Sequence, residues 1–297
     1  MDPKIVIYAL GLKGLKILKA SEAVESLSYI HQVIVGSDRG VENDYADTII
    51  DFCKFNKLVW VRKDEHKDWV TSPNEIIAIA AGWRWMINES YRKIIIIHDS
   101  LLPRYRGFNP LVSALLAKDP IIGITALLAE GEYDCGPIVG RRELSINYPI
   151  KVAEVTSRIA DLYFDLACEI FESLGSGKSL IGVPQDHTKA TYSIWRDEED
   201  YRVNWRRSAE DLRHFINCVG SPYRGASARY ENCLIRIHDA EIDKDVELVN
   251  RDVGKVIFIR DNQPVIICGI GLLRLTNVTD ENGFNALPFK KFRIRLN

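Results

Sequence analysis

IIIIHDSLLPRYRGFNP, residues 94–110, runs from four consecutive isoleucines into a histidine and then into a turn. Four β-branched residues in a row are typical of a strand that is covered on both faces, as at the centre of a parallel sheet. In such sheets the ligand crevice lies at the carboxyl ends of the strands, which is where His98 falls. A core histidine hydrogen-bonded to backbone is the alternative interpretation, because histidines often have intermediate burial.

Strand and helix patterns alternate on both sides of this stretch, which predicts an α/β domain with a mostly parallel, Rossmann-like sheet. A long helix over residues 152–174 is indicated by apolar side chains at helical spacing, and we expect it to pack on that sheet. The other predicted strands are KIVIYAL (4–10), QVIVGSD (32–38), KLVWV (57–61), EIIAIAA (75–81), IIGITALLA (121–129) and GPIVGRRELSI (136–146), and the other helices follow at 11–23, 45–56 and 109–119.

The pattern changes near residue 190. SAEDLRHFINCVGS at 208–221 predicts one helix, and several short strands separated by turn residues follow it. This texture is typical of a small β-barrel rather than of a second α/β unit. We therefore predict an α/β domain over residues 1–190 and a smaller, OB-like β-barrel domain over residues 191–297.

Composition favours a small-molecule enzyme. The 297 residues are 46% hydrophobic and 27% charged, with a net charge of -2. The chain therefore lacks the excess positive charge that would predict binding to a nucleic acid or to an anionic membrane. Residues 191–297 hold 17 Lys and Arg against 16 Asp and Glu, a net of +1. The six scattered cysteines favour a reducing compartment over a disulfide framework or a metal site. The sequence shows no signal peptide or membrane span, so we expect a cytoplasmic location.

Five segments carry a resemblance to a known family: HDSLLPRYRG (98–107), IGIT (122–125), YDCGPI (133–138), VPQDHTKATYS (183–193) and INCVGSPYRGA (216–226). Together they resemble the folate-dependent formyltransferases, a group that includes methionyl-tRNA formyltransferase and enzymes that N-formylate nucleotide-linked amino sugars. The resemblance covers nearly the whole chain. It implies a Rossmann-like domain that binds 10-formyltetrahydrofolate and passes its formyl group to an amine.

The resemblance also implies catalytic residues. The family uses an Asn, a His two positions later and an Asp before the GPI strand, and His98 and Asp134 match the last two. The chemistry is reasonable, because attack of an amine on a formamide carbon creates an oxyanion and moves protons. A histidine changes charge near neutral pH, and a carboxylate beside it orients the ring. Taken alone, Asp134 would be read as a turn-capping loop residue.

The family Asn is replaced by Ile96 in this chain. Losing one oxyanion donor can cost about a hundredfold to a thousandfold in rate. His98 as imidazolium could carry the oxyanion alone, or Ser100, Asn109 or a backbone N–H could take over. A third interpretation is a catalytically impaired protein that binds folate without turnover.

The resemblance places the folate between two loops. Its pterin is expected to contact backbone groups of Trp85, Met86 and Ile87 after the fourth strand and of the loop before the catalytic Asp. The residues of this loop before the catalytic Asp are Glu130, Gly131, Glu132 and Tyr133.

Arg104 and Arg106 are candidate substrate-binding residues. One of them would be structural, and the other would face a substrate phosphate.

The favoured acceptor is the amine of a nucleotide-linked amino sugar, in a pathway of polysaccharide or glycan synthesis. Initiator methionyl-tRNA is the alternative, but the near-neutral second domain and the missing Asn speak against it, because phosphate contacts need clustered positive charge. We therefore expect no nucleic-acid partner. Homodimers are common among such enzymes, although no sequence feature locates an interface. The nucleotide and the sugar are not readable from the sequence.

Overall fold

The computed structural model describes residues 3–66, 75–87, 91–231 and 233–297. Contacts within the chain divide it into two compact units. The first comprises residues 1–39, 43–146 and 156–195, and the second comprises residues 40–42, 147–155 and 196–297. No helix among the described residues has both the length and the apolar character that crossing a membrane requires.

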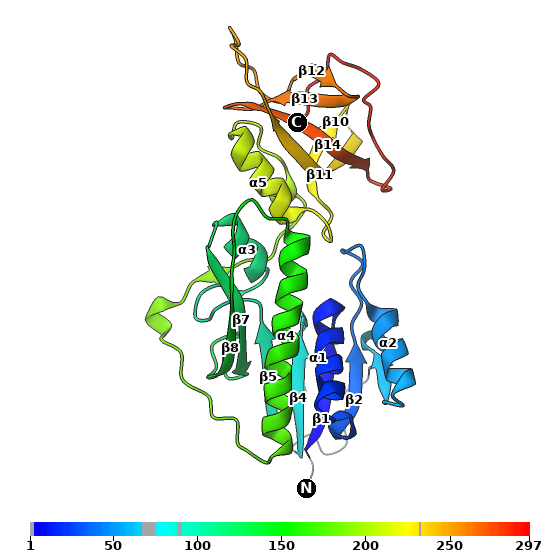
Figure 1. Ribbon diagram of the computed structural model, residues 1–297, viewed down its shortest axis with the longest axis vertical. Coiled ribbons are helices and arrows are strands. Elements are labelled where there is room, and N and C mark those ends of the chain that lie inside the picture. The colour runs from blue at the N-terminus through cyan, green and yellow to red at the C-terminus, as the bar shows by residue number, and fades with distance from the viewer. Residues whose placement is uncertain (1–2, 67–74, 88–90, 232) are drawn as a thin grey trace. The chain divides into compact units, whose positions relative to one another are not determined.

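The first unit is built on a seven-stranded sheet in the order β3-β2-β1-β4-β5-β7-β8 (Figure 1). The five strands from β3 to β5 pair in parallel, which confirms the predicted Rossmann-like sheet, whereas β7 and β8 are antiparallel. The strands are β1 (Lys4–Ala9), β2 (Ile30–Val35), β3 (Trp60–Arg62), β4 (Ile76–Ala81), β5 (Lys93–His98), β7 (Ile121–Leu128) and β8 (Ile138–Ser145). The helices are α1 (Gly11–Ala23), α2 (Ala46–Phe55), α3 (Pro110–Leu116) and α4 (Val152–Gly175), with short 3-10 turns at Leu27–Tyr29, Lys63–Glu65 and His187–Lys189.

Helix α4 is the long predicted helix, and it packs on the sheet through close contacts. A Cβ atom added to Gly140 of β8 would lie 2.7 Å from a Leu166 methyl group, so the glycine makes room for the helix. The Tyr163 hydroxyl of α4 donates to the Ile97 carbonyl of β5 at 2.7 Å. These contacts fix the carboxyl end of β5, which carries His98.

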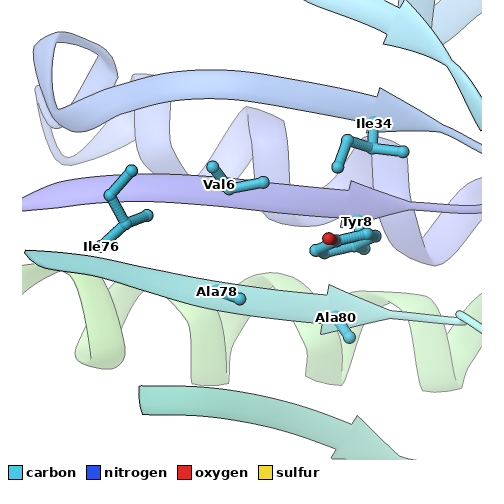
Figure 2. Packing of buried hydrophobic residues seen from close by; sticks show 6 residues of the cluster. All are labelled: Val6, Tyr8, Ile34, Ile76, Ala78 and Ala80. Carbon is cyan, nitrogen blue, oxygen red and sulfur yellow. The ribbon is translucent and has the colours of Figure 1, made fainter. Parts of the chain in front are cut away.

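Strand β5 is not buried equally on its two faces. Ile95 and Ile97 are buried, whereas Ile94 and Ile96 are half-buried and pack on an apolar cluster of β1, β2 and β4. Six members of that cluster come from these three strands, as Figure 2 shows. Side chains alternate between the faces of a strand, so Ile96 lies on the same face as His98. The prediction that β5 is fully covered on both faces is therefore wrong for the face that carries Ile94 and Ile96. The six cluster residues labelled in Figure 2 are Val6, Tyr8, Ile34, Ile76, Ala78 and Ala80.

The second unit contains a five-stranded antiparallel sheet in the order β10-β11-β14-β13-β12. This confirms the predicted change from an α/β pattern to a second domain built on consecutive β-strands. The Ser208 side chain accepts a hydrogen bond from the Asp211 amide and caps the helix α5 that precedes the strands. The elements are α5 (Ala209–Val219), β10 (Ala226–Tyr230), β11 (Cys233–Asp243), β12 (Val256–Arg260), β13 (Gln263–Ile267) and β14 (Leu272–Asp280), with a 3-10 turn at Glu199–Tyr201.

Candidate active site

His98 ends strand β5 and is only 8% exposed. Its Nε2 atom lies 2.8 Å from the Tyr105 carbonyl, and its Nδ1 atom lies 3.5 Å from Asp134 Oδ1. The backbone contact is the one expected of a structural histidine, but the carboxylate on the other side is not. Because a carbonyl and a carboxylate only accept, the ring can donate to both only as imidazolium.

Asp134 lies between β7 and β8 and is 9% exposed. Its Oδ2 atom accepts the Gly107 amide hydrogen at 2.8 Å, which leaves Oδ1 facing His98. The backbone of Asp134 has φ +59°, a left-handed conformation that Asp and Asn adopt more easily than most residues. The structure therefore brings together the two residues that the sequence predicted as a pair.

Asp99, which follows His98, contacts the buried Tyr163 and the partly exposed Lys13, and sequence reasoning missed these contacts. The Tyr163 hydroxyl, which lies 2.7 Å from the Ile97 carbonyl, is also 2.8 Å from the Asp99 carboxylate and shares its single proton between these two acceptors. Asp99 also forms an ion pair with Lys13. Burial, and then the neighbouring Asp99 charge, raise the pKa of Tyr163 well above its usual value. Tyr163 is therefore a protonated donor that anchors the residue following His98. Of Lys13, Asp99 and Tyr163, only Asp99 lies in the motif HDSLLPRYRG, so only Asp99 could have been singled out from the sequence.

Arg104 and Arg106 differ sharply in environment. Arg104 is half exposed and pairs with Asp119, which also accepts the Tyr105 hydroxyl at 3.0 Å. Burial and this acceptor raise the pKa of Tyr105. Arg106 is 1% exposed and donates to the Gln185 side-chain oxygen at 2.7 Å. Arg106 is thus held by a group of the protein itself, as expected of the structural member of the pair, and it also lines the cavity described next.

The loop before Asp134 borders an open cavity of about 500 Å³. This volume falls in the range of about 300–1,000 Å³ that small-molecule sites occupy. Residues 130–133 are exposed, and their amide N–H groups make no hydrogen bond within the described part of the chain. These donors are available to a ligand, as the predicted folate loop requires. The cavity is lined by Arg106, Glu130, Gly131, Glu132, Cys135, His187 and Tyr192.

Trp85 and its neighbours lie elsewhere along the strand ends. The Trp85 ring approaches Gly36, where an added Cβ would be 2.9 Å away, and the Lys63 ammonium lies 4.8 Å from the ring centroid. Gly36 and Lys63 follow β2 and β3, so the ring lies over that side of the sheet and not beside Asp134. Met86 is 81% exposed, and Ile87 packs on the apolar cluster. The structure does not bring Trp85 together with the pair.

Comparison with known proteins places this geometry in a family. Residues 82–168 match the model of the formyl transferase domain, and residues 196–292 match that of the formyl transferase C-terminal domain. Methionyl-tRNA formyltransferase of Carboxydothermus hydrogenoformans is 30% identical over 234 residues, which cover 77% of this chain and 73% of that protein. The chain belongs to the formyl transferase family. The predicted folate-dependent formyltransferase is thereby confirmed.

Solved structures share the fold of this formyltransferase at low sequence identity. The N-formyltransferase of Helicobacter canadensis, in complex with folinic acid and dTDP-3-aminofucose, matches with a TM-score of 0.67 and 13% identity over 93% of this chain and 100% of that one. HypX of Aquifex aeolicus, in complex with tetrahydrofolic acid, has a TM-score of 0.62 and 20% identity over 95% of this chain and 45% of HypX. Among the described residues of our chain, no group of three or more His, Cys, Asp and Glu side chains could hold a metal ion.

Ile96 is where this formyltransferase departs from the family pattern. The side chain packs with Trp83 and Ile87 on the apolar cluster. Of the substitute donors considered, the Ser100 hydroxyl is buried and donates to the Arg104 carbonyl at 2.7 Å. The Asn109 side-chain amide makes no hydrogen bond within the described residues and is exposed. The Asn109 side-chain amide could therefore donate to a substrate oxygen, whereas the proton of the Ser100 hydroxyl is already donated to the Arg104 carbonyl.

We expect Ile96→Asn to lower the free energy of unfolding by about 1–3 kcal/mol, because it places an amide in an apolar cluster. Tetrahydrofolate affinity should stay within about threefold, since the predicted folate contacts are backbone groups. Urea unfolding and a binding titration measure the two quantities, with Ile96→Val as the matched control that keeps the apolar packing. An Asn variant as stable as the Val variant would contradict the packing role of Ile96.

Proposed function

We propose that this formyltransferase moves the formyl group of 10-formyltetrahydrofolate to the amine of a nucleotide-linked amino sugar. The observation that carries the proposal is the buried His98–Asp134 pair at 3.5 Å. The residues on either side of Asp134 in the sequence, Glu132 and Cys135 among them, line a cavity of about 500 Å³. Two titratable groups paired at the end of a sheet strand, with a ligand-sized cavity along the adjoining loop, are typical of a catalytic site. We assign both residues as catalytic.

The binding site of the formyl donor is proposed at the loop of residues 130–133. When bound there, 10-formyltetrahydrofolate supplies the formyl carbon that the amine attacks. The unpaired amide N–H groups of the loop can bind carbonyl and ring-nitrogen acceptors, and the carboxylates of Glu130 and Glu132 can accept from amino groups. Trp85, Met86 and Ile87 are proposed as the opposite wall, which requires a ligand long enough to reach across several strand ends.

His98 and Asp134 have complementary roles in the proposed reaction. The His98 imidazolium donates a hydrogen bond toward the formyl oxygen as that oxygen gains negative charge. In doing so it exchanges the Tyr105 carbonyl, its present Nε2 partner, for the substrate. Asp134 stabilises the charged ring and stays oriented by the Gly107 amide hydrogen. As the amine nitrogen bonds to the formyl carbon, it loses a proton to the His98–Asp134 pair. As the bond between the formyl carbon and the folate nitrogen breaks, the pair returns a proton to that nitrogen, so tetrahydrofolate can leave and the protonation of the pair is restored. The surrounding burial shields the pair from water.

Charge pairing in the second unit favours a small acceptor over tRNA. Ion pairs with carboxylates engage at least nine of the 17 Lys and Arg residues between positions 191 and 297. Each phosphate contact in a nucleic-acid interface needs a cation that is free to replace counterions. A domain whose cations are largely neutralised internally, with a net charge of +1, is poorly suited to that task.

Methionyl-tRNA is the second candidate acceptor. It is favoured by the 30% identity with a methionyl-tRNA formyltransferase over 77% of this chain. Because members of this family formylate different amines on a common fold, the family alone does not select between the two acceptors.

The acceptor is tested by incubating the purified protein with 10-formyltetrahydrofolate and a panel of UDP- and dTDP-linked amino sugars. We expect mass spectrometry to show one sugar that gains a single formyl group, because a specific site rejects analogues that leave its polar groups unpaired. Aminoacylated initiator tRNA serves as the parallel substrate. Formylation of the tRNA and of no sugar would contradict the proposed acceptor, and the Asp134→Asn variant serves as the control for uncatalysed transfer.

A further inference from the structure

Gln185 connects two parts of the candidate active site although it lies far from them in sequence. Its side chain is 7% exposed and belongs to the segment of residues 183–193. The Nε2 group donates to the Asp134 carbonyl and to the Gly136 carbonyl, each at 2.8 Å. The two bonds therefore hold the backbone on which the Asp134 carboxylate is mounted. Gln185 itself does not line the cavity beside the pair.

Arg106 fixes the orientation of this amide. Its Nε and Nη2 atoms donate to Gln185 Oε1 at 3.3 and 2.7 Å. A guanidinium has only donors, so the oxygen of the amide must face Arg106 and the NH₂ group must face the two carbonyls. Arg106 has no carboxylate within ion-pair distance in the described part of the chain. Its buried charge therefore depends on this amide oxygen and on His187 Nδ1, which lies 3.2 Å from Nη2.

The segment of residues 183–193 also holds the Tyr105 loop, whose carbonyl lies at His98 Nε2. The Thr191 side chain and carbonyl accept the Tyr105 and Arg106 amide hydrogens, both at 2.9 Å. Short strands β6 (Arg106–Gly107) and β9 (Tyr192–Ser193) continue this pairing. Tyr105 supplies the carbonyl at His98 Nε2, and Gly107 supplies the amide at Asp134 Oδ2. Residues 185–193 thus brace both members of the pair.

Asp134 needs such a brace because of its backbone conformation. A non-glycine residue in the left-handed region is held there by its surroundings, and Asp134 has φ +59°. Its neighbours on the amino-terminal side, residues 130–133, are exposed, and their amide groups make no backbone hydrogen bond to the described residues. The Cys135 amide donates to the Glu132 carbonyl at 3.4 Å across this turn. The shorter bonds from Gln185 to the Asp134 carbonyl and from Gly107 to the Asp134 carboxylate, each at 2.8 Å, further constrain where the carboxylate points.

We propose that Gln185, oriented by Arg106, is a positioning residue that holds the Asp134 carboxylate against His98. This inference rests on the proposed function, in which Asp134 and His98 are catalytic. A displacement of about 1 Å in such a group can cost about a hundredfold in rate. Gln185 touches neither the cavity nor the paired side chains, so its effect is on the rate of the chemical step and not on substrate binding.

The test is Gln185→Glu, which keeps an acceptor for Arg106 but removes the two donors to the Asp134 and Gly136 carbonyls. With 10-formyltetrahydrofolate and the UDP- or dTDP-linked amino sugar that gives product, we expect kcat to fall about 10- to 100-fold. The KM values for 10-formyltetrahydrofolate and for the amino sugar should stay within about threefold, because the contacts that bind the two substrates before the reaction are unchanged. Gln185→Asn, whose amide is one methylene shorter and cannot reach both carbonyls, is the second variant if the first does not fold. Lys189→Ala, an exposed change in the same segment, is the control.

A double-variant cycle separates positioning from a general structural role. If Gln185 acts through the Asp134 carboxylate, adding Gln185→Glu to Asp134→Asn should lower kcat by less than about twofold. Losses that multiply in the double variant, or a Gln185 variant as fast as Lys189→Ala, would overturn the proposal while leaving the proposed function intact. An Asp134→Asn enzyme as fast as wild type would overturn both.

Discussion

Replacing His98 by alanine is expected to lower kcat for formyl transfer by about a thousandfold, within the range of general acid–base and oxyanion contributions. The ring contacts both Asp134 and the Tyr105 carbonyl, and alanine can neither donate nor carry charge. Tetrahydrofolate binding should change by less than about threefold, because the lost interaction belongs to the transition state.

The measurement for His98→Ala is steady-state kinetics combined with a tetrahydrofolate titration followed by tryptophan fluorescence. His31→Ala is the matched control, since His31 is exposed on β2 of the same sheet. A His98→Ala enzyme within tenfold of wild type would show that the ring is the backbone-bonded structural histidine considered at the outset.

Asp134→Asn is expected to lower kcat by about a hundredfold to a thousandfold with little change in stability, because only the charge is removed. Asn has the same shape, tolerates the left-handed backbone at this position and can still accept from the Gly107 amide. Its NH₂ group can then face His98 Nδ1, so the ring loses the negatively charged acceptor on which the proposed mechanism depends.

The kinetics of Asp134→Asn are best compared with those of Asp51→Asn, an exposed aspartate on α2. Thermal unfolding of both variants checks that the loop is intact. Loss of activity accompanied by a large drop in the unfolding temperature would assign Asp134 to structure, and unchanged activity would remove it from the mechanism.

The part of the fold that follows hydrophobic periodicity could be predicted from the sequence. Alternating strand and helix patterns located the elements of the first unit, and the isoleucine run located β5 and placed His98 at its end. The direction of β7 and β8 could not be predicted, because an apolar strand has the same side-chain pattern in either direction. Periodicity also did not reveal that Ile96 is only half-buried where it packs on the apolar cluster.

Contacts between distant segments account for what the sequence did not show at the site. Arg104 and Arg106 are two residues apart in the same motif, yet one is half exposed and the other is buried against Gln185. Neither charge nor spacing distinguishes them, since the partner lies 79 positions away. Lys13 and Tyr163 were missed for the same reason, because each meets Asp99 only after the sheet has formed.

The most direct test of the central claim is the single-turnover rate of formyl transfer in wild type and in Asp134→Asn, with the protein in excess over 10-formyltetrahydrofolate and the identified amino-sugar acceptor saturating. Single turnover isolates the chemical step from product release. We predict that wild type transfers the formyl group of each bound 10-formyltetrahydrofolate and that the variant does so at least about a hundredfold more slowly. Equal rates in the two proteins would contradict the assignment of the His98–Asp134 pair as the catalytic centre.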